Sequence, residues 1–160
     1  MRFHALPDSR RYAASEDEYA EILRRHGAVG AALFIEGAPL YLYRAHLAEP
    51  RLRGRQKHQI AGRQFRENLV VLPPEGAGQD GDGDRMYVRA LATHWKPDFF
   101  EAAIRLIADW QEVGITFACP ATKNIFCPYD GGMDVFTFSI APEELRARFA
   151  GWRSTHPDGL

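Results

Sequence analysis

Two carboxylates, Asp130 and Asp134, lie four residues apart in the sequence Tyr-Asp-Gly-Gly-Met-Asp, which begins at Tyr129. A turn at the two glycines would bring them close enough to share a proton or a metal ion, and paired carboxylates can act as general acid and base. An aspartate before two glycines is also common in turns, where its carboxylate caps backbone N–H groups and a glycine adopts positive φ. We favour this structural interpretation, and we take Tyr129, Asp130 and Asp134 as candidate binding residues, with no catalytic residue assigned.

Positive charge is concentrated between Arg51 and Arg66, a segment that contains no acidic residue. An element of this composition can bind an acidic partner, so the candidate binding residues also include Arg53, Arg55 and Lys57. The alternative is a solvent-exposed helix face whose charge is balanced by acidic residues elsewhere, and the near-neutral chain favours it. The 20 basic and 21 acidic residues give a formal net charge of -1, which argues against a nucleic-acid partner.

No sequence motif identifies an enzyme or a cofactor site. The phosphate-binding Gly-x-x-x-x-Gly-Lys, the nucleophile-elbow Gly-x-Ser-x-Gly and the zinc-protease His-Glu-x-x-His patterns are all absent from the chain. The 6 histidines are scattered, so one could reach the aspartates only through folding. Asp80, Asp82 and Asp84 resemble the start of an EF-hand loop but lack its closing glutamate, and Cys119 and Cys127 lack the spacing of a zinc site. We therefore expect no metal and no cofactor.

The first third of the chain predicts a helix followed by a β-hairpin. Ser15 is a suitable N-cap with acidic residues after it, and Gly27 offers a left-handed stop, so we expect a helix over residues 16–26. Apolar residues then predict strands over 28–36 and 40–47, joined by a turn.

The middle of the chain predicts a charged surface helix, then an exposed loop and a strongly amphipathic helix. The surface helix has a narrow apolar stripe, and the loop is rich in glycine and aspartate. The amphipathic helix follows a proline suited to its first position. The expected elements are a helix over 49–68, a strand over 69–72, a loop over 73–84, a strand over 86–92 and a helix over 98–112.

The last third is rich in strands and predicts the fold class. We expect strands over 115–119, 125–127 and 133–140, and a final helix that begins at Pro142. Hairpins interleaved with single helices are typical of an antiparallel or mixed sheet. The sequence therefore predicts one α+β domain over 1–160, with about four helices mainly on one face of the sheet.

Composition is consistent with an ordinary globular protein. The 160 residues are 46% apolar and 26% charged, enough for a core without metals or disulfides. The chain lacks a leading apolar stretch typical of a secretory signal and any run long enough for a membrane span. We expect a cytoplasmic protein without membrane contact, and composition leaves the oligomeric state open.

The region from Asn124 to Val135 resembles a bacterial family of unknown function that is recognised by a Tyr-Asp-Asp-Arg-Gly-x-Asp motif. Tyr129, Asp130, Gly132 and Asp134 match that pattern. This chain is one residue shorter at the motif and lacks its arginine, so no role of that arginine carries over. The order of the upstream elements is also similar, and the resemblance covers about residues 40–153.

The resemblance implies a binding function. Small proteins of this kind resemble those found beside secreted bacterial toxins, which implies an immunity protein that neutralises a cognate toxin by direct binding. The alternative is an enzyme, a hydrolase or nuclease that uses Asp130 and Asp134 with a histidine brought near by folding. The partner's identity and the surface that binds it stay open at this point.

Overall fold

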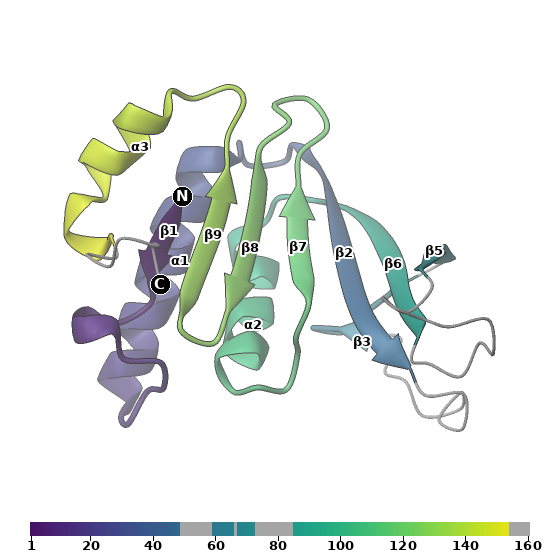
Figure 1. The fold of residues 1–160 in the computed structure, drawn as a ribbon, viewed down its shortest axis with the longest axis horizontal. Coiled ribbons are helices and arrows are strands. Elements are labelled where there is room, and N and C mark those ends of the chain that lie inside the picture. Colours follow the sequence, from purple (N-terminus) through teal and green to yellow (C-terminus); the bar gives the residue numbers. More distant parts are fainter. Residues whose placement is uncertain (49–58, 66, 73–84, 154–160) are drawn as a thin grey trace, which may run out of the picture.

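The computed structural model describes residues 1–48, 59–65, 67–72 and 85–153, and its main feature is an antiparallel sheet of 7 strands in the order β1-β9-β8-β7-β2-β6-β5 (Figure 1). These strands are β1 (Arg2–His4), β2 (Pro39–Ala48), β5 (Glu67–Leu72), β6 (Arg85–His94), β7 (Ile115–Ala118), β8 (Ile125–Tyr129) and β9 (Gly132–Phe136). A separate small hairpin joins β3 (Gln59–Ile60) to β4 (Arg63–Gln64).

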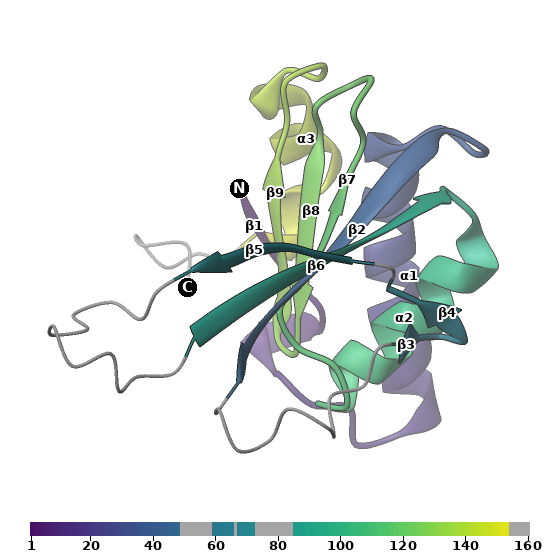
Figure 2. The same ribbon diagram turned by 90° about the vertical axis from the view of Figure 1, so that its right-hand side faces the viewer.

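The described α-helices are α1 (Glu16–Leu33), α2 (Pro97–Ala108) and α3 (Pro142–Arg148), with short 3-10 turns at η1 (Pro7–Ser9) and η3 (Ala150–Trp152). Figures 1 and 2 show α1 and α2 side by side on one face of the sheet, while α3 lies beside the β1 edge. The predicted α+β class and the antiparallel sheet are confirmed. None of these helices combines the length and apolar character of a membrane span.

The helix α1 begins where the sequence predicts and extends beyond its predicted end. Ser15 accepts a hydrogen bond from the backbone N–H of Glu18, and the Glu18 carboxylate reaches back to the N–H of Ala14 at 2.7 Å. The helix then passes through Gly27 and ends at Leu33. The predicted strand over 28–36 is therefore wrong over 28–33, because packing of its apolar residues against the sheet holds them in the helix.

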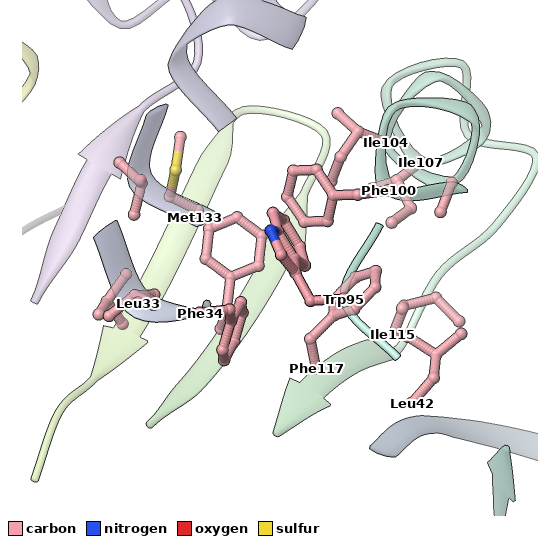
Figure 3. Close-up of a cluster of buried hydrophobic side chains, with 14 of the residues drawn as sticks. Leu33, Phe34, Leu42, Trp95, Phe100, Ile104, Ile107, Ile115, Phe117 and Met133 are labelled. Carbon is pink, nitrogen blue, oxygen red and sulfur yellow. The ribbon is translucent and has the colours of Figure 1, made fainter. Parts of the chain in front are cut away.

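Gly30 allows α1 to approach an aromatic cluster at the centre of the core. A Cβ atom at this position would lie 2.6 Å from the ring of Trp95, which is buried. The Phe100 ring lies 4.5 Å from Trp95 and 5.2 Å from Phe117, measured between centroids. Figure 3 shows these rings between the helices and the sheet. Gly30, which the sequence placed in a predicted strand, is thus required for packing within α1.

The predicted surface helix over 49–68 is wrong where the structure describes it. Ala61 and Gly62 both have positive φ, at 45° and 75°, which is the geometry of a tight hairpin turn and not of a helix. Residues 59–60 and 63–64 form the two strands of that hairpin. The candidate binding residues Arg53, Arg55 and Lys57, and the predicted loop over 73–84, lie outside the described residues.

The helix α2 ends at Ala108, earlier than the predicted position 112. Trp110 has a φ of 59°, which ends the helical path, and the chain then turns so that Glu112 is buried against Arg44 of β2 in an ion pair. Gly114 is needed next to β2, since a Cβ atom there would lie 2.1 Å from the carbonyl oxygen of Ala45. The early end of the helix follows from this buried pair, which sequence patterns do not reveal.

The remaining predicted elements are confirmed with shifts at their ends. They are the strands predicted over 40–47, 69–72, 86–92, 115–119 and 125–127, the first part of the strand predicted over 133–140, and the final helix at Pro142. The strand predicted over 133–140 ends at Phe136, because buried Asn124 accepts hydrogen bonds from Thr137, Phe138 and Ser139 and holds that segment in a bend.

Two glycines of α1 provide a matched test of this packing. We expect Gly30→Ala to lower the free energy of unfolding by about 1–3 kcal/mol, because the added methyl group collides with the rigidly packed Trp95. Gly27 has no atom within 4 Å of its Cβ position, so Gly27→Ala should raise stability by about 0.5–1 kcal/mol through helix propensity. Urea unfolding of both variants measures the difference, and equal effects would contradict the packing described.

Candidate functional site

A polar cleft of about 370 Å³ lies at the β1 edge of the sheet and contains two of the candidate binding residues. It joins the end of β8 and the start of β9 to the first eleven residues of the chain. The lining residues are Arg2, His4, Ser9, Arg11, Tyr129, Gly131 and Asp134. We call this the β1-edge cleft.

An ion pair fixes one side of the β1-edge cleft. Arg2 and Asp134 lie directly opposite each other on β1 and β9, and the guanidinium donates from Nε and Nη2 to the two carboxylate oxygens at 2.8 and 2.9 Å. The Arg2 guanidinium also lies over the ring of Tyr129, 5.5 Å from its centroid. Burial raises the pKa of Tyr129 to about 12, so its hydroxyl stays protonated at neutral pH.

The two glycines of the motif allow β1 to pack against β9. A Cβ atom on Gly132 would lie 2.2 Å from the carbonyl oxygen of Phe3, and Gly131 accepts a hydrogen bond from the N–H of Ala5 at 3.0 Å. The predicted positive φ is wrong, since neither of these glycines is in the left-handed region. Glycine is required here for space and not for backbone conformation.

Asp130 does not play the structural role predicted for it. Within the described chain no backbone N–H of the turn donates to its carboxylate, and Oδ2 is buried without a hydrogen-bond partner. Asp130 also does not line the β1-edge cleft, whereas Asp134 does. The structure therefore separates the two aspartates: one is paired with Arg2, and the other lies in the turn behind the cleft.

The opposite wall of the β1-edge cleft comes from the polar segment that leads into α1. The Oγ atom of Ser9 lies 3.2 Å from Nε2 of His4, in a turn where Ser9 has a φ of 57°. Burial lowers the pKa of His4, and the charges of Arg25 and Arg2 lower it further, so the ring is neutral at pH 7. Arg11 is exposed and makes no ion pair or hydrogen bond within the described residues.

The sequence did not identify Arg2, His4, Ser9 and Arg11 as candidate site residues. They lie more than 115 positions from Tyr129 and carry no local motif, so only the pairing of β1 with β9 brings them together. The positive charge of the arginines near the start of the chain is the one signal that could have indicated a site, and a few charges in so short a segment do not identify one. Among the residues that the structure describes, no group of three or more histidine, cysteine or acidic side chains could hold a metal ion.

A second surface feature lies on the face of the sheet opposite α1 and α2. Residues directly opposite one another in antiparallel strands point to the same face, and the pairings Phe136↔Ile125, Ile125↔Ala118 and Ala118↔Tyr41 form one row across four strands. Tyr43 stacks beside Tyr41, with ring centroids 6.1 Å apart. We call Tyr41, Tyr43, Ala118, Ile125 and Phe136 the open-face patch.

The open-face patch is partly exposed to solvent and lies beside the β1-edge cleft. Tyr41 is 40% exposed and Phe136 is 54% exposed. Thr116 is paired with Tyr43 and contacts Cys127, which is paired with Asp134 of the cleft. Figure 2 shows α1 and α2 on one side of these strands only. An apolar surface therefore continues into a charged one along the sheet.

A buried histidine of α1 contacts β9, the strand that carries Asp134 of the β1-edge cleft. The two ring nitrogens of His26 lie 2.8 Å and 3.2 Å from the carbonyl oxygens of Ile22 and Gly132. Burial lowers the pKa of His26 to about 4, although both carbonyl contacts raise it. The ring is therefore neutral in the folded protein and links α1 to the first residue of β9.

Comparison with known proteins gives one family. The family model described as "Domain of unknown function (DUF3885)" matches residues 1–157, a wider range than the expected 40–153. No curated protein and no solved structure gives a significant match to the chain.

Acidification should destabilise the protein through His26. Between its ordinary pKa of 6.5 and its folded-state pKa of about 4, the unfolded chain binds a proton that the folded chain does not. Stability is thus complete above pH 6.5 and falls by roughly 3 kcal/mol as the pH approaches 4. We expect His26→Gln to flatten this slope in urea unfolding between pH 4.5 and 7, while His4→Gln keeps most of it. An unchanged slope in His26→Gln would contradict this assignment.

Proposed function

Because the chain belongs to the family described as Domain of unknown function (DUF3885), which brings no reaction with it, we propose a function from its surface. The protein binds another protein through the open-face patch and the adjoining β1-edge cleft. More specifically, it is an immunity protein that neutralises a bacterial toxin by direct binding.

The exposed aromatic surface of the sheet is the observation that carries this proposal. An apolar sheet face normally packs against another layer, yet α1 and α2 cover only the opposite face. Tyrosine and phenylalanine that remain exposed in one continuous patch are typical anchors of protein interfaces. The rigid strands hold these side chains in place, so little conformational entropy is lost on binding.

The β1-edge cleft adds charge at the border of this patch. Interfaces commonly combine an apolar centre with a polar rim, and the rim sets partner choice and association rate. Arg11 and the Arg2–Asp134 pair supply such a rim next to Tyr129. This arrangement supports binding to a partner that carries acidic groups near an apolar surface.

A bacterial toxin as partner is what the resemblance carried by the motif around Tyr129 implies. The proposal places the protein in the bacterial cytoplasm. The free thiols of Cys119 and Cys127 agree with a reducing compartment.

The partner test uses the product of a gene adjacent to the one that encodes this chain. Co-expression should rescue growth from that product, and the two proteins should co-purify. Phe136→Arg should weaken the complex by about 30-fold or more, as loss of an interface anchor does. Ile35→Arg is the matched control, because Ile35 is 75% exposed and lies outside the open-face patch.

Two results would contradict the binding proposal. The first is a neighbouring product that is neither toxic nor bound. The second is equal protection and equal affinity for Phe136→Arg and Ile35→Arg, which would remove the open-face patch from the interface. Thermal unfolding of both variants verifies that each remains folded.

The enzyme alternative keeps one observation in its favour. His4 and Asp134 line the same cleft, so a histidine and one of the two aspartates do meet in space. A hydrolase or nuclease would use His4 as its general base. Asp130, the other predicted partner, is outside the cleft lining, and both oxygens of Asp134 already accept hydrogen bonds from Arg2.

A direct assay separates this alternative from binding. If the chain is a hydrolase, His4→Gln should lower hydrolysis of a phosphodiester or ester substrate by at least about 100-fold, the usual contribution of a general base. His4→Gln leaves the Arg2–Asp134 pair intact, and Asp130→Asn tests the other aspartate. Activity that is absent from the wild type, with or without added divalent metal, would contradict the enzyme alternative.

A further inference from the structure

We propose that the β1-edge cleft is a binding site for an oxyanion, a carboxylate or a phosphate group, with Arg11 as its charged ligand. The site is built by the described residues alone, and it does not depend on the identification of a toxin. If the protein also binds a partner through this edge, an acidic side chain of that partner is one source of the oxyanion, and a small phosphorylated molecule is the other.

Arg11 carries the positive charge that is available to a ligand in this part of the molecule. The neighbouring arginines are already paired: Arg10 with Glu18, Arg25 with Glu21 and Arg2 with Asp134. Arg11 lines the cleft without an ion pair in the described chain, and its Cγ lies close to Gly131, 3.1 Å from where a Cβ would stand. A planar guanidinium in this situation can donate two parallel hydrogen bonds to one oxyanion.

Neutral donors surround the same space. The Ser9 hydroxyl and the neutral His4 ring contact each other, so one of the two keeps a donor for a ligand, and the protonated Tyr129 phenol of the same lining supplies another. Several donors that converge on one cleft suit an oxyanion, which accepts hydrogen bonds at every oxygen. A cation would find few acceptors here, because the Asp134 oxygens are occupied by Arg2.

The one carboxylate that lines the cleft is not available to pair with Arg11. Asp134 is neutralised by its two hydrogen bonds with Arg2, and Asp130 does not line the cleft and has one buried carboxylate oxygen. Arg25, which is paired with Glu21, donates to the carbonyl oxygen of His4 and so helps to fix the backbone at that side of the cleft. Within the cleft lining, Arg11 is therefore the arginine whose charge is not already paired in the described chain, and its charge favours an anion.

The test is a titration of the ¹⁵N-labelled full chain at constant ionic strength with inorganic phosphate, phenyl phosphate and glutarate, in separate series. We expect saturable chemical-shift changes at the Arg11 side chain and at the amides of Ser9 and Tyr129. Arg11→Gln should weaken binding by about tenfold, the usual effect of losing a charge-assisted pair. Arg10→Gln is the matched control, since it removes the same charge one residue away, outside the cleft lining.

Each result of the anion titration supports or contradicts a stated part of the proposal. Tighter binding of the two phosphates points to a phosphorylated small molecule, and tighter binding of glutarate points to an acidic side chain. Non-saturable shifts, or equal losses in Arg11→Gln and Arg10→Gln, would overturn the site, because they would show only general charge screening. If the chain binds these anions but does not protect cells from the toxin, the oxyanion site is supported and the toxin proposal is contradicted. The failure of one proposal can therefore be distinguished from the failure of the other.

Discussion

The close approach of Gly132 to the backbone of Phe3 is the contact on which the functional edge of this protein depends. A side chain at position 132 would stand 2.2 Å from the Phe3 carbonyl oxygen and would force β1 away from β9. Since β1 supplies Arg2 and His4, the β1-edge cleft exists only because this pair of strands can close. His26 of α1 contacts the same residue from the helix side, because its Nε2 atom lies 3.2 Å from the carbonyl oxygen of Gly132.

The rest of the fold follows from covering one face of an antiparallel sheet. The rings of Trp95, Phe100 and Phe117 fill the space between the sheet and the two helices, and Gly30 gives α1 room beside them. Burying the apolar residues on this side leaves the aromatic row of the other side beside solvent. A one-sided architecture therefore produces both the stable core and the surface that we propose for binding.

Two buried polar side chains, Asn124 and Arg44, join parts of the chain that are distant in sequence. Asn124 donates to the carbonyl oxygen of Leu33 at 3.0 Å and accepts from the segment after β9, so it joins α1 to the last strand. Arg44 is paired with Glu112 in the core and lies over the ring of Phe65, 4.7 Å from its centroid. Such buried pairs contribute more to a unique arrangement than to net stability, because desolvation offsets much of their attraction.

The local features of this protein can be read from short stretches of its sequence. The N-cap at Ser15, the proline that opens α2 and the apolar runs of the strands depend on neighbouring residues, and so they could be predicted, as could the α+β class. Features that depend on contacts between distant residues became visible with the folded structure. It continued α1 through Gly27, turned the segment around Ala61 and Gly62 into a hairpin, and brought Arg2, His4, Ser9 and Arg11 to Tyr129. The physical reason is that a glycine, an arginine or a histidine has no fixed role in its local sequence, and acquires one from the residues that folding places against it.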